Sequence, residues 1–148
     1  MSRSGYDDSD YDSCDDWERI MWRGAVASSI RGKRGQAFLR ELIEVLDAMP
    51  EKRLIANDLV KDGAVCAIGS VGVQRGVALE KLDPDYPEQI AEAFGIAAAL
   101  VREIEWINDE GGLYAETPEI RWCRMRAWAA KMLKLRAAKL AATPITGA

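Results

Sequence analysis

The densest cluster of basic residues lies at residues 31–36, which read Arg-Gly-Lys-Arg-Gly-Gln. Arg31, Lys33 and Arg34 supply three positive charges, and a helical pattern follows them directly. The first N–H groups of a helix have no partner inside the helix, so they can bind an anion beside cationic side chains. With Gln36, this run is a candidate contact for a small anionic ligand or a partner. The alternative is a tight inter-helix turn whose cations stay solvated.

A second set of cations recurs at helical spacing after the helix-start signal Thr117-Pro118. At 100° per residue, one arc of this helix is apolar and carries Trp122, Met125, Ala129, Met132, Leu133 and Leu140. The opposite arc carries Arg121, Arg124, Lys131, Lys134 and Lys139, with Trp128 at its edge. Arg121, Arg124, Trp128 and Lys131 are therefore candidate partner contacts. A core-packing helix with a solvated basic face is the alternative.

The N-terminal residues carry the opposite charge. Residues 1–14 are rich in Asp, Ser and Gly, and we expect them to form a mobile tail because they offer little apolar surface to bury. The candidate contacts in this tail are Asp7, Asp8, Asp10 and Asp12, which could mimic a phosphate backbone. A solvated tail that aids solubility is the alternative.

Composition narrows the chemistry that the chain can perform. The sequence contains no histidine, which excludes Ser-His-Asp and Cys-His nucleophile pairs and ordinary histidine-containing zinc sites. Its three cysteines have no metal-binding spacing, and we interpret them as reduced thiols. Carboxylates such as Asp58 or Glu110 could serve an enzyme, but no constellation accompanies them. We therefore expect no enzyme, no metal and no cofactor.

Periodicity and caps predict most of the helices. A first helix is expected from Trp17 to about Ile30, with Trp17, Ile20, Met21 and Ala25 on its buried side. A second runs from about Gly35 to Met49 and ends at Pro50. Residues 64–73 are apolar on nearly every side and fit a helix, whereas Asp62-Gly63 is a turn signal that fits a β-hairpin near 53–67.

Residues 88–106 have the spacing of a helix-turn-helix. Ala91 stands where two helices touch, Gly95 at the turn, and Val101 on the inner face of the second helix. The positions that would read bases hold three alanines and two glutamates beside one arginine, Arg102, and this set suits DNA recognition poorly. A structural helix pair is the preferred interpretation, and a sequence-reading module is the alternative.

Together these patterns predict a mainly α protein, a single compact helical domain of about five to six helices with room for one short β-hairpin. The expected boundaries are an acidic tail at 1–14, a helical domain at 15–142 and a flexible C-terminus at 143–148. No window is apolar enough for a membrane span, and no signal peptide is apparent, so we expect a cytoplasmic protein.

Five segments carry a resemblance: RGKRGQAFLREL at 31–42, VCAIG at 65–69, FGI at 94–96, INDE at 107–110 and ETPEIRW at 116–122. They resemble a family of small uncharacterised proteins from tailed-phage and prophage genomes. The resemblance implies a setting, the bacterial cytoplasm during infection or lysogeny. It implies no activity, and it assigns no residue a role.

Two functions remain after these exclusions. The first is a non-enzymatic interaction protein that binds and inhibits or redirects a host factor, such as a counter-defence protein that masks a host protein or sequesters a small anionic signal. The second is a nucleic-acid-binding regulator that uses residues 88–106 and the basic face of the last helix. Its affinity would depend on phosphate contacts, which the acidic chain, with a net charge of −4, disfavours.

Overall fold

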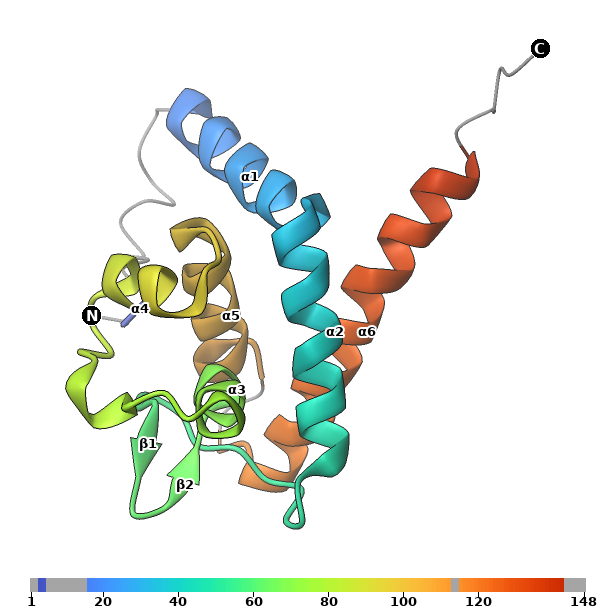
Figure 1. Cartoon of the computed structure of the whole chain (residues 1–148). Coiled ribbons are helices and arrows are strands. Elements are labelled where there is room, and N and C mark those ends of the chain that lie inside the picture. Colours follow the sequence, from blue (N-terminus) through green and yellow to red (C-terminus); the bar gives the residue numbers. More distant parts are fainter. Residues whose placement is uncertain (1–2, 5–15, 113–114, 143–148) are drawn as a thin grey trace.

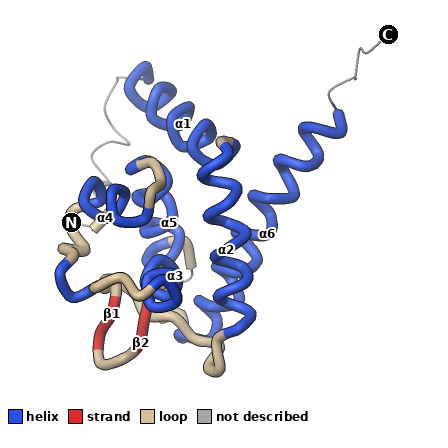
Figure 2. The backbone as a smooth tube through the Cα atoms, in the orientation of Figure 1, coloured by secondary structure: helices blue, strands red, loops and turns tan. Residues whose placement is uncertain are grey.

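The computed structural model describes residues 3–4, 16–112 and 115–142 of the chain. Its elements are α1 (Asp16–Arg31), α2 (Lys33–Ala48), β1 (Val60–Lys61), β2 (Ala64–Val65), α3 (Ala67–Arg75), the 3-10 turn η2 (Leu79–Lys81), α4 (Pro87–Phe94), α5 (Ala98–Glu110) and α6 (Pro118–Ala142). The predicted mainly helical fold with one short hairpin is confirmed (Figure 2).

The helices are arranged around α5. This helix contacts α1, α3, α4 and α6, while α2 and α6 lie side by side along the other edge of the molecule (Figure 1). Fully buried side chains from every layer meet in one core, among them Phe38, Leu42, Ile68, Ile90, Leu100, Ile104 and Met125. No helix in the described part of the chain is long and apolar enough to cross a membrane.

A single residue, Gly32, separates α1 from α2. A Cβ atom added at Gly35 would lie 1.9 Å from the backbone oxygen of Ser29, so the two helices approach as closely as their backbones allow. The side chain of Gln36 is buried and donates to the Ile30 carbonyl at 2.7 Å, which satisfies the end of α1. The joint is therefore a fixed corner, and Gln36 is part of its interior.

The buried side that the sequence predicts for α1 is wrong at three of its four residues. Ile20 and Met21 are 61% and 59% exposed and Ala25 is exposed as well, whereas Val26 and Ile30 lie in the core. The side chain of the fourth residue, Trp17, lies outside the described part of the chain. Helix α1 packs against both α2 and α5, and Val26 and Ile30 supply its buried side, which leaves two large apolar residues on the surface.

Residues 60–75 form both of the predicted alternatives in succession. Val60 pairs with Val65, and the turn between them has positive φ at Asp62 (52°) and Gly63 (81°), as a two-residue hairpin turn requires. Helix α3 then begins after Cys66, whose sulfur accepts the N–H of Gly69 at 3.3 Å. The apolar run after the turn forms this helix.

The corner between α1 and α2 gives a test of the fold. Gly35→Ala should lower the free energy of unfolding by about 2 kcal/mol or more, because neither the new Cβ nor the Ser29 carbonyl can move without displacing backbone. Gly24→Ala is the matched control: its Cβ would meet nothing within 4 Å, so it should stabilise α1 by about 0.5–1 kcal/mol. Urea denaturation measures the free energy of unfolding of each variant. Equal effects of the two substitutions would contradict the close contact between Gly35 and Ser29.

Candidate functional site

The cations predicted at the helix joint lie on the surface. Arg31, Lys33 and Arg34 are all exposed, and Arg34 is 3.5 Å from the carbonyl oxygen of Gly95, at the limit of a hydrogen bond. Among the described residues, nothing forms an ion pair with Arg31 or Lys33. The joint therefore presents three positive charges to solvent. Gln36, the fourth predicted contact, is buried and is not part of this surface.

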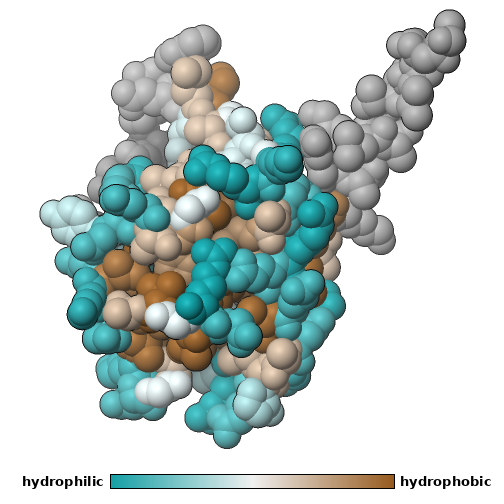
Figure 3. All heavy atoms as spheres, in the orientation of Figure 1, coloured by the Kyte–Doolittle hydropathy of each residue, from teal (hydrophilic) through white to brown (hydrophobic). Residues whose placement is uncertain are grey.

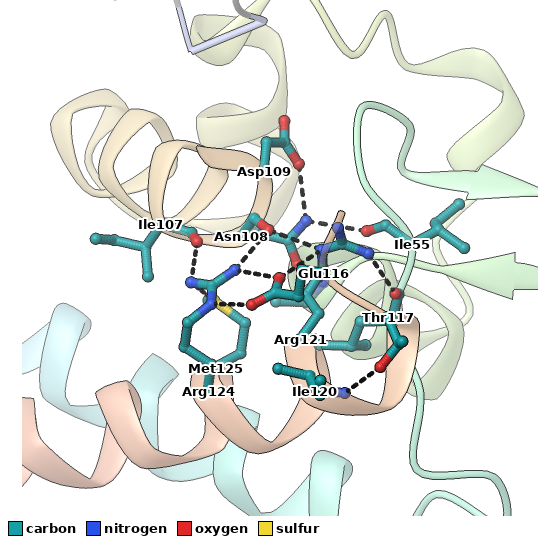
Figure 4. A network of polar contacts seen from close by, with 12 residues as sticks. Ile55, Ile107, Asn108, Asp109, Glu116, Thr117, Ile120, Arg121, Arg124 and Met125 are labelled. Atoms are coloured by element: carbon teal, nitrogen blue, oxygen red, sulfur yellow. Dashed lines mark hydrogen bonds and ion pairs between the residues drawn. The ribbon is translucent and has the colours of Figure 1, made fainter. Parts of the chain in front are cut away.

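Arg121 and Arg124 are engaged within the chain (Figure 4). Arg124 binds both carboxylate oxygens of Glu116 at 2.7 and 2.8 Å and donates to the carbonyl oxygens of Ile107 and Asn108. Arg121 donates to the carbonyl oxygen of Asn108 at 3.0 Å. The two guanidinium groups satisfy the C-terminal end of α5 and are not presented to solvent.

Glu116 joins these two arginines. Its side chain is 5% exposed and lies 3.3 Å from the Nε atom of Arg121 as well as 2.7 Å from that of Arg124. The hydrogen bond from Arg124 lowers the pKa of the Glu116 carboxyl, and the charge of Arg121 acts in the same direction. The network is therefore fully charged, and it fixes the start of α6 against α5.

The remaining predicted contacts are divided between surface and interior. Trp128 is half-buried and packs against the core, so it is less available than its place beside the cations suggests. Lys131 is exposed. The four tail carboxylates, Asp7, Asp8, Asp10 and Asp12, lie outside the described residues.

Helices α4 and α5 have the geometry of a helix-turn-helix. Gly95 ends α4 in the left-handed conformation, with φ of 68°, and its N–H reaches the Ala91 carbonyl. However, α5 is enclosed: its buried residues are Leu100, Val101, Glu103, Ile104, Glu105 and Asn108. The helix that would read bases is therefore the central packing element of the domain.

Asn108 is a buried connection that the sequence did not reveal. Its carbonyl oxygen accepts the N–H of Ala67 at 3.1 Å, and its amide donates to the Ile55 carbonyl at 3.0 Å and to Asp109 at 2.8 Å. The available signal was the spacing of Glu105, Asn108 and Asp109, which places three polar side chains on one face of α5.

Arg3 occupies a buried acidic site against that face. Its Nε and Nη2 atoms donate to the carboxylate of Asp109 at 2.6 and 2.9 Å, and the two side chains are 2% and 3% exposed. Glu105 lies 3.9 Å away, and the Cys66 sulfur lies 3.8 Å from Nη1. Arg3 and Ser4 are thus buried, although they belong to a segment that the sequence predicts to be a mobile tail.

Glu105 is the least satisfied group in this site. Its side chain is 0% exposed, and neither carboxylate oxygen has a hydrogen-bond partner among the described residues. Burial raises its pKa to about 8; Asp109 and Asp85 add to this rise, while Arg3 and Arg102 oppose it. The Glu105 carboxyl is therefore held protonated near neutral pH.

The carboxyl groups of Glu105 and Asp109 are suited to bind an organic cation such as a guanidinium group, but two carboxyl groups are too few for a metal centre. In the described ranges, no group of three or more Cys, Asp or Glu side chains is placed to hold a metal ion. Comparisons with protein-family models, with curated proteins and with solved structures found no match.

Removing the Asn108 side chain should destabilise the domain. Asn108→Ala takes the partners away from the Ala67 N–H and the Ile55 carbonyl, and we expect a loss of about 3 kcal/mol in the free energy of unfolding. Glu92→Ala, at an exposed position of α4, is the control and should change it by less than about 0.5 kcal/mol. A loss below about 1 kcal/mol for Asn108→Ala would mean that the connection does not hold α5 to α3.

Glu105 should make the stability depend on pH. Its folded pKa of about 8 exceeds the ordinary value of 4.5, so its contribution is complete below about pH 4.5 and is lost as the pH rises through about 8. From pH 5.5 to 8.5 the wild type should lose on the order of 3 kcal/mol relative to Glu105→Gln, which does not titrate.

Urea denaturation at the two pH values measures this difference. Glu92→Gln, which removes a solvated carboxylate from the surface, should follow the wild-type profile. Parallel profiles for the wild type and Glu105→Gln would show that Glu105 does not retain its proton in the folded state.

Proposed function

We propose that this chain is a non-enzymatic interaction protein of a tailed phage or prophage that binds and inhibits or redirects a host factor in the bacterial cytoplasm. The contact surface is the outer face of α1 together with the joint that follows it. We define this contact surface by its exposed residues: Ile20, Met21, Gly24, Ala25, Ser28, Arg31, Lys33 and Arg34. The phage setting rests on the sequence resemblance, and the surface rests on the exposure of these residues.

The observation that carries the proposal is the exposure of two large apolar residues on a helix that has its own buried side. Val26 and Ile30 bury α1 against the core, so Ile20 and Met21 are not needed there and remain more than half exposed. Apolar side chains that border charged ones are typical of protein contact surfaces. Another exposed apolar residue, Val73, lies on α3 and is 60% exposed, and hydrophobic residues gather on the surface there (Figure 3).

The charge of the contact surface selects the partner. Arg31, Lys33 and Arg34 stand together on a chain whose net charge is −4. Complementary charge speeds encounter and suppresses wrong partners more than it adds affinity. The partner is accordingly a protein with an acidic patch beside an apolar one, and a small anionic ligand could occupy the same three cations.

The joint also holds these cations in place before binding. The contact of Gly35 with Ser29 and the hydrogen bond from Gln36 to Ile30 fix the backbone on both sides of Lys33. A preformed backbone lowers the entropy that association costs. This favours binding at the joint over binding at a flexible loop of the same charge.

A DNA-binding regulator fits the structure less well. The second helix of the pair is enclosed by the domain, and Arg121 and Arg124 are occupied at the end of α5. Neither direct base readout nor a row of phosphate contacts is therefore within reach of these residues. A DNA-binding regulator would nevertheless shift duplex DNA with an affinity that falls steeply as salt rises, and that result would replace the present proposal.

The contact surface can be tested by capture from lysate of infected bacteria. The triple variant Arg31→Ala, Lys33→Ala, Arg34→Ala should keep the wild-type melting temperature and bind the captured host protein about tenfold more weakly, at roughly 0.5 kcal/mol per rim charge. Met21→Asp should weaken the same complex independently, because it places a charge in the apolar part of the surface.

The matched control removes the same charge elsewhere. Arg40, Lys61 and Lys81 are exposed on α2, β1 and η2, and their triple alanine variant should bind as the wild type does. Equal binding by both triple variants would remove the joint from the contact surface. A protein captured by every variant alike would have to bind another face of the molecule.

A further inference from the structure

The Arg3 side chain lies in a buried site formed by residues that are distant from it in sequence. The guanidinium pocket, as we name it, is formed by Glu105 and Asp109 of α5 and by Cys66 before α3. These residues come from parts of the chain far from Arg3 in sequence, and the Arg3 side chain is 2% exposed among them. Two parallel N–H···O bonds to one carboxylate are the usual way in which a guanidinium group is recognised.

The walls of the pocket do not depend on Arg3 for their positions. Asp109 accepts the backbone N–H of Asn57 at 3.1 Å and the amide of Asn108 at 2.8 Å. Cys66 is held by the Gly69 N–H at the start of α3, and Glu105 lies on the enclosed helix. The Asp109 carboxylate is therefore oriented by two donors from its own surroundings before any cation binds.

Arg3 satisfies only part of this pocket. It donates two hydrogen bonds to Asp109 but stands 3.9 Å from the nearest oxygen of Glu105, beyond hydrogen-bond distance. In the described residues both oxygens of Glu105 lack a hydrogen-bond partner although the side chain is fully buried. The pocket thus contains a buried acceptor that Arg3 does not use, and a ligand with one further donor would fit it better.

We propose that the pocket formed by Glu105, Asp109 and Cys66 is a binding site for an external guanidinium group, and that Arg3 is a tethered occupant which this group displaces. Lysine would fit poorly, since an ammonium group cannot make the two parallel bonds to Asp109. The external group is a small guanidine compound or an arginine side chain of a partner protein. This site is separate from the contact surface on α1, so the two proposals can be tested independently of each other.

Attachment to the same chain explains why Arg3 holds the pocket without a perfect fit. A tethered group competes at an effective concentration on the order of millimolar. A free guanidine must exceed that concentration or make better contacts before it displaces Arg3. Removing the Arg3 side chain should therefore uncover an affinity that the wild type largely hides.

The experiment compares the full chain with its Arg3→Ala variant by isothermal titration, with agmatine as the ligand. Agmatine carries a guanidinium group for Asp109 and an ammonium group as the additional donor. We expect Arg3→Ala to bind it about tenfold more tightly than the wild type, as release from millimolar competition predicts. Cadaverine, a diamine without a guanidinium group, is the matched control and should not bind.

Two further arms locate the ligand and its source. The double variant Arg3→Ala, Asp109→Asn should lose agmatine binding by at least tenfold. A blocked tripeptide, acetyl-Ala-Arg-Ala-amide, tests whether a peptide arginine can enter. Binding of the tripeptide as well as agmatine indicates a protein source for the guanidinium group, and binding of agmatine alone indicates a small molecule.

The proposal survives a variant that does not fold. In that case the wild type provides the test: in the ¹⁵N-labelled chain, agmatine should move the Arg3 Nε–H resonance to the position of a solvated arginine. A folded Arg3→Ala variant that binds no agmatine at tens of millimolar would overturn the proposal. So would an Arg3 resonance that agmatine leaves unchanged, because Arg3 would then be a permanent part of the fold.

Discussion

The enclosure of α5 is the constraint on which the rest of the structure depends. A helix surrounded by others must satisfy its polar groups without water, because an unpaired buried group costs about 1–3 kcal/mol. Several segments supply the partners of α5: Arg3, Arg23, Ile55, Ala67, Arg121 and Arg124. Each of these contacts fixes one segment against the central helix. The polar groups of one element thus position much of the domain.

Cations at helix ends repeat this arrangement across the molecule. Arg75 donates to the last carbonyl of α4 at 2.9 Å, and Lys52 reaches three carbonyl oxygens near the end of α2. Arginine and lysine at such positions satisfy terminal carbonyls and interact favourably with the helix dipole. Many of the cations therefore stabilise the fold. These cations are occupied within the chain and are not available to a partner. The exposed cations at the α1–α2 joint differ from them in this respect.

The two proposed sites use charge in opposite ways. At the joint, Arg31 and Lys33 are exposed to solvent, so their electrostatic effect is long-range and screened by salt. In the guanidinium pocket, the contact between Asp109 and Arg3 is withdrawn from water, so its effect is local and depends on geometry. A ligand for one site would have little effect on the other. Binding at the proposed contact surface would therefore leave Arg3 in its site.

The sequence by itself determined the local structure. Gly95 and Pro118 marked helix boundaries, because glycine tolerates the positive φ at the end of α4 and proline suits the first turn of α6, and Asp62-Gly63 marked the hairpin turn. For α6 the spacing also predicted the buried arc, since Met125 and Ala129 lie in the core, whereas only the tertiary structure decided which face of α1 is buried. It turned Ile20 and Met21 outward, drew Arg121 and Arg124 into the end of α5, and placed Arg3 beside Asp109. These outcomes depend on contacts between residues far apart in the chain, and the spacing of residues within one helix carries no information about them.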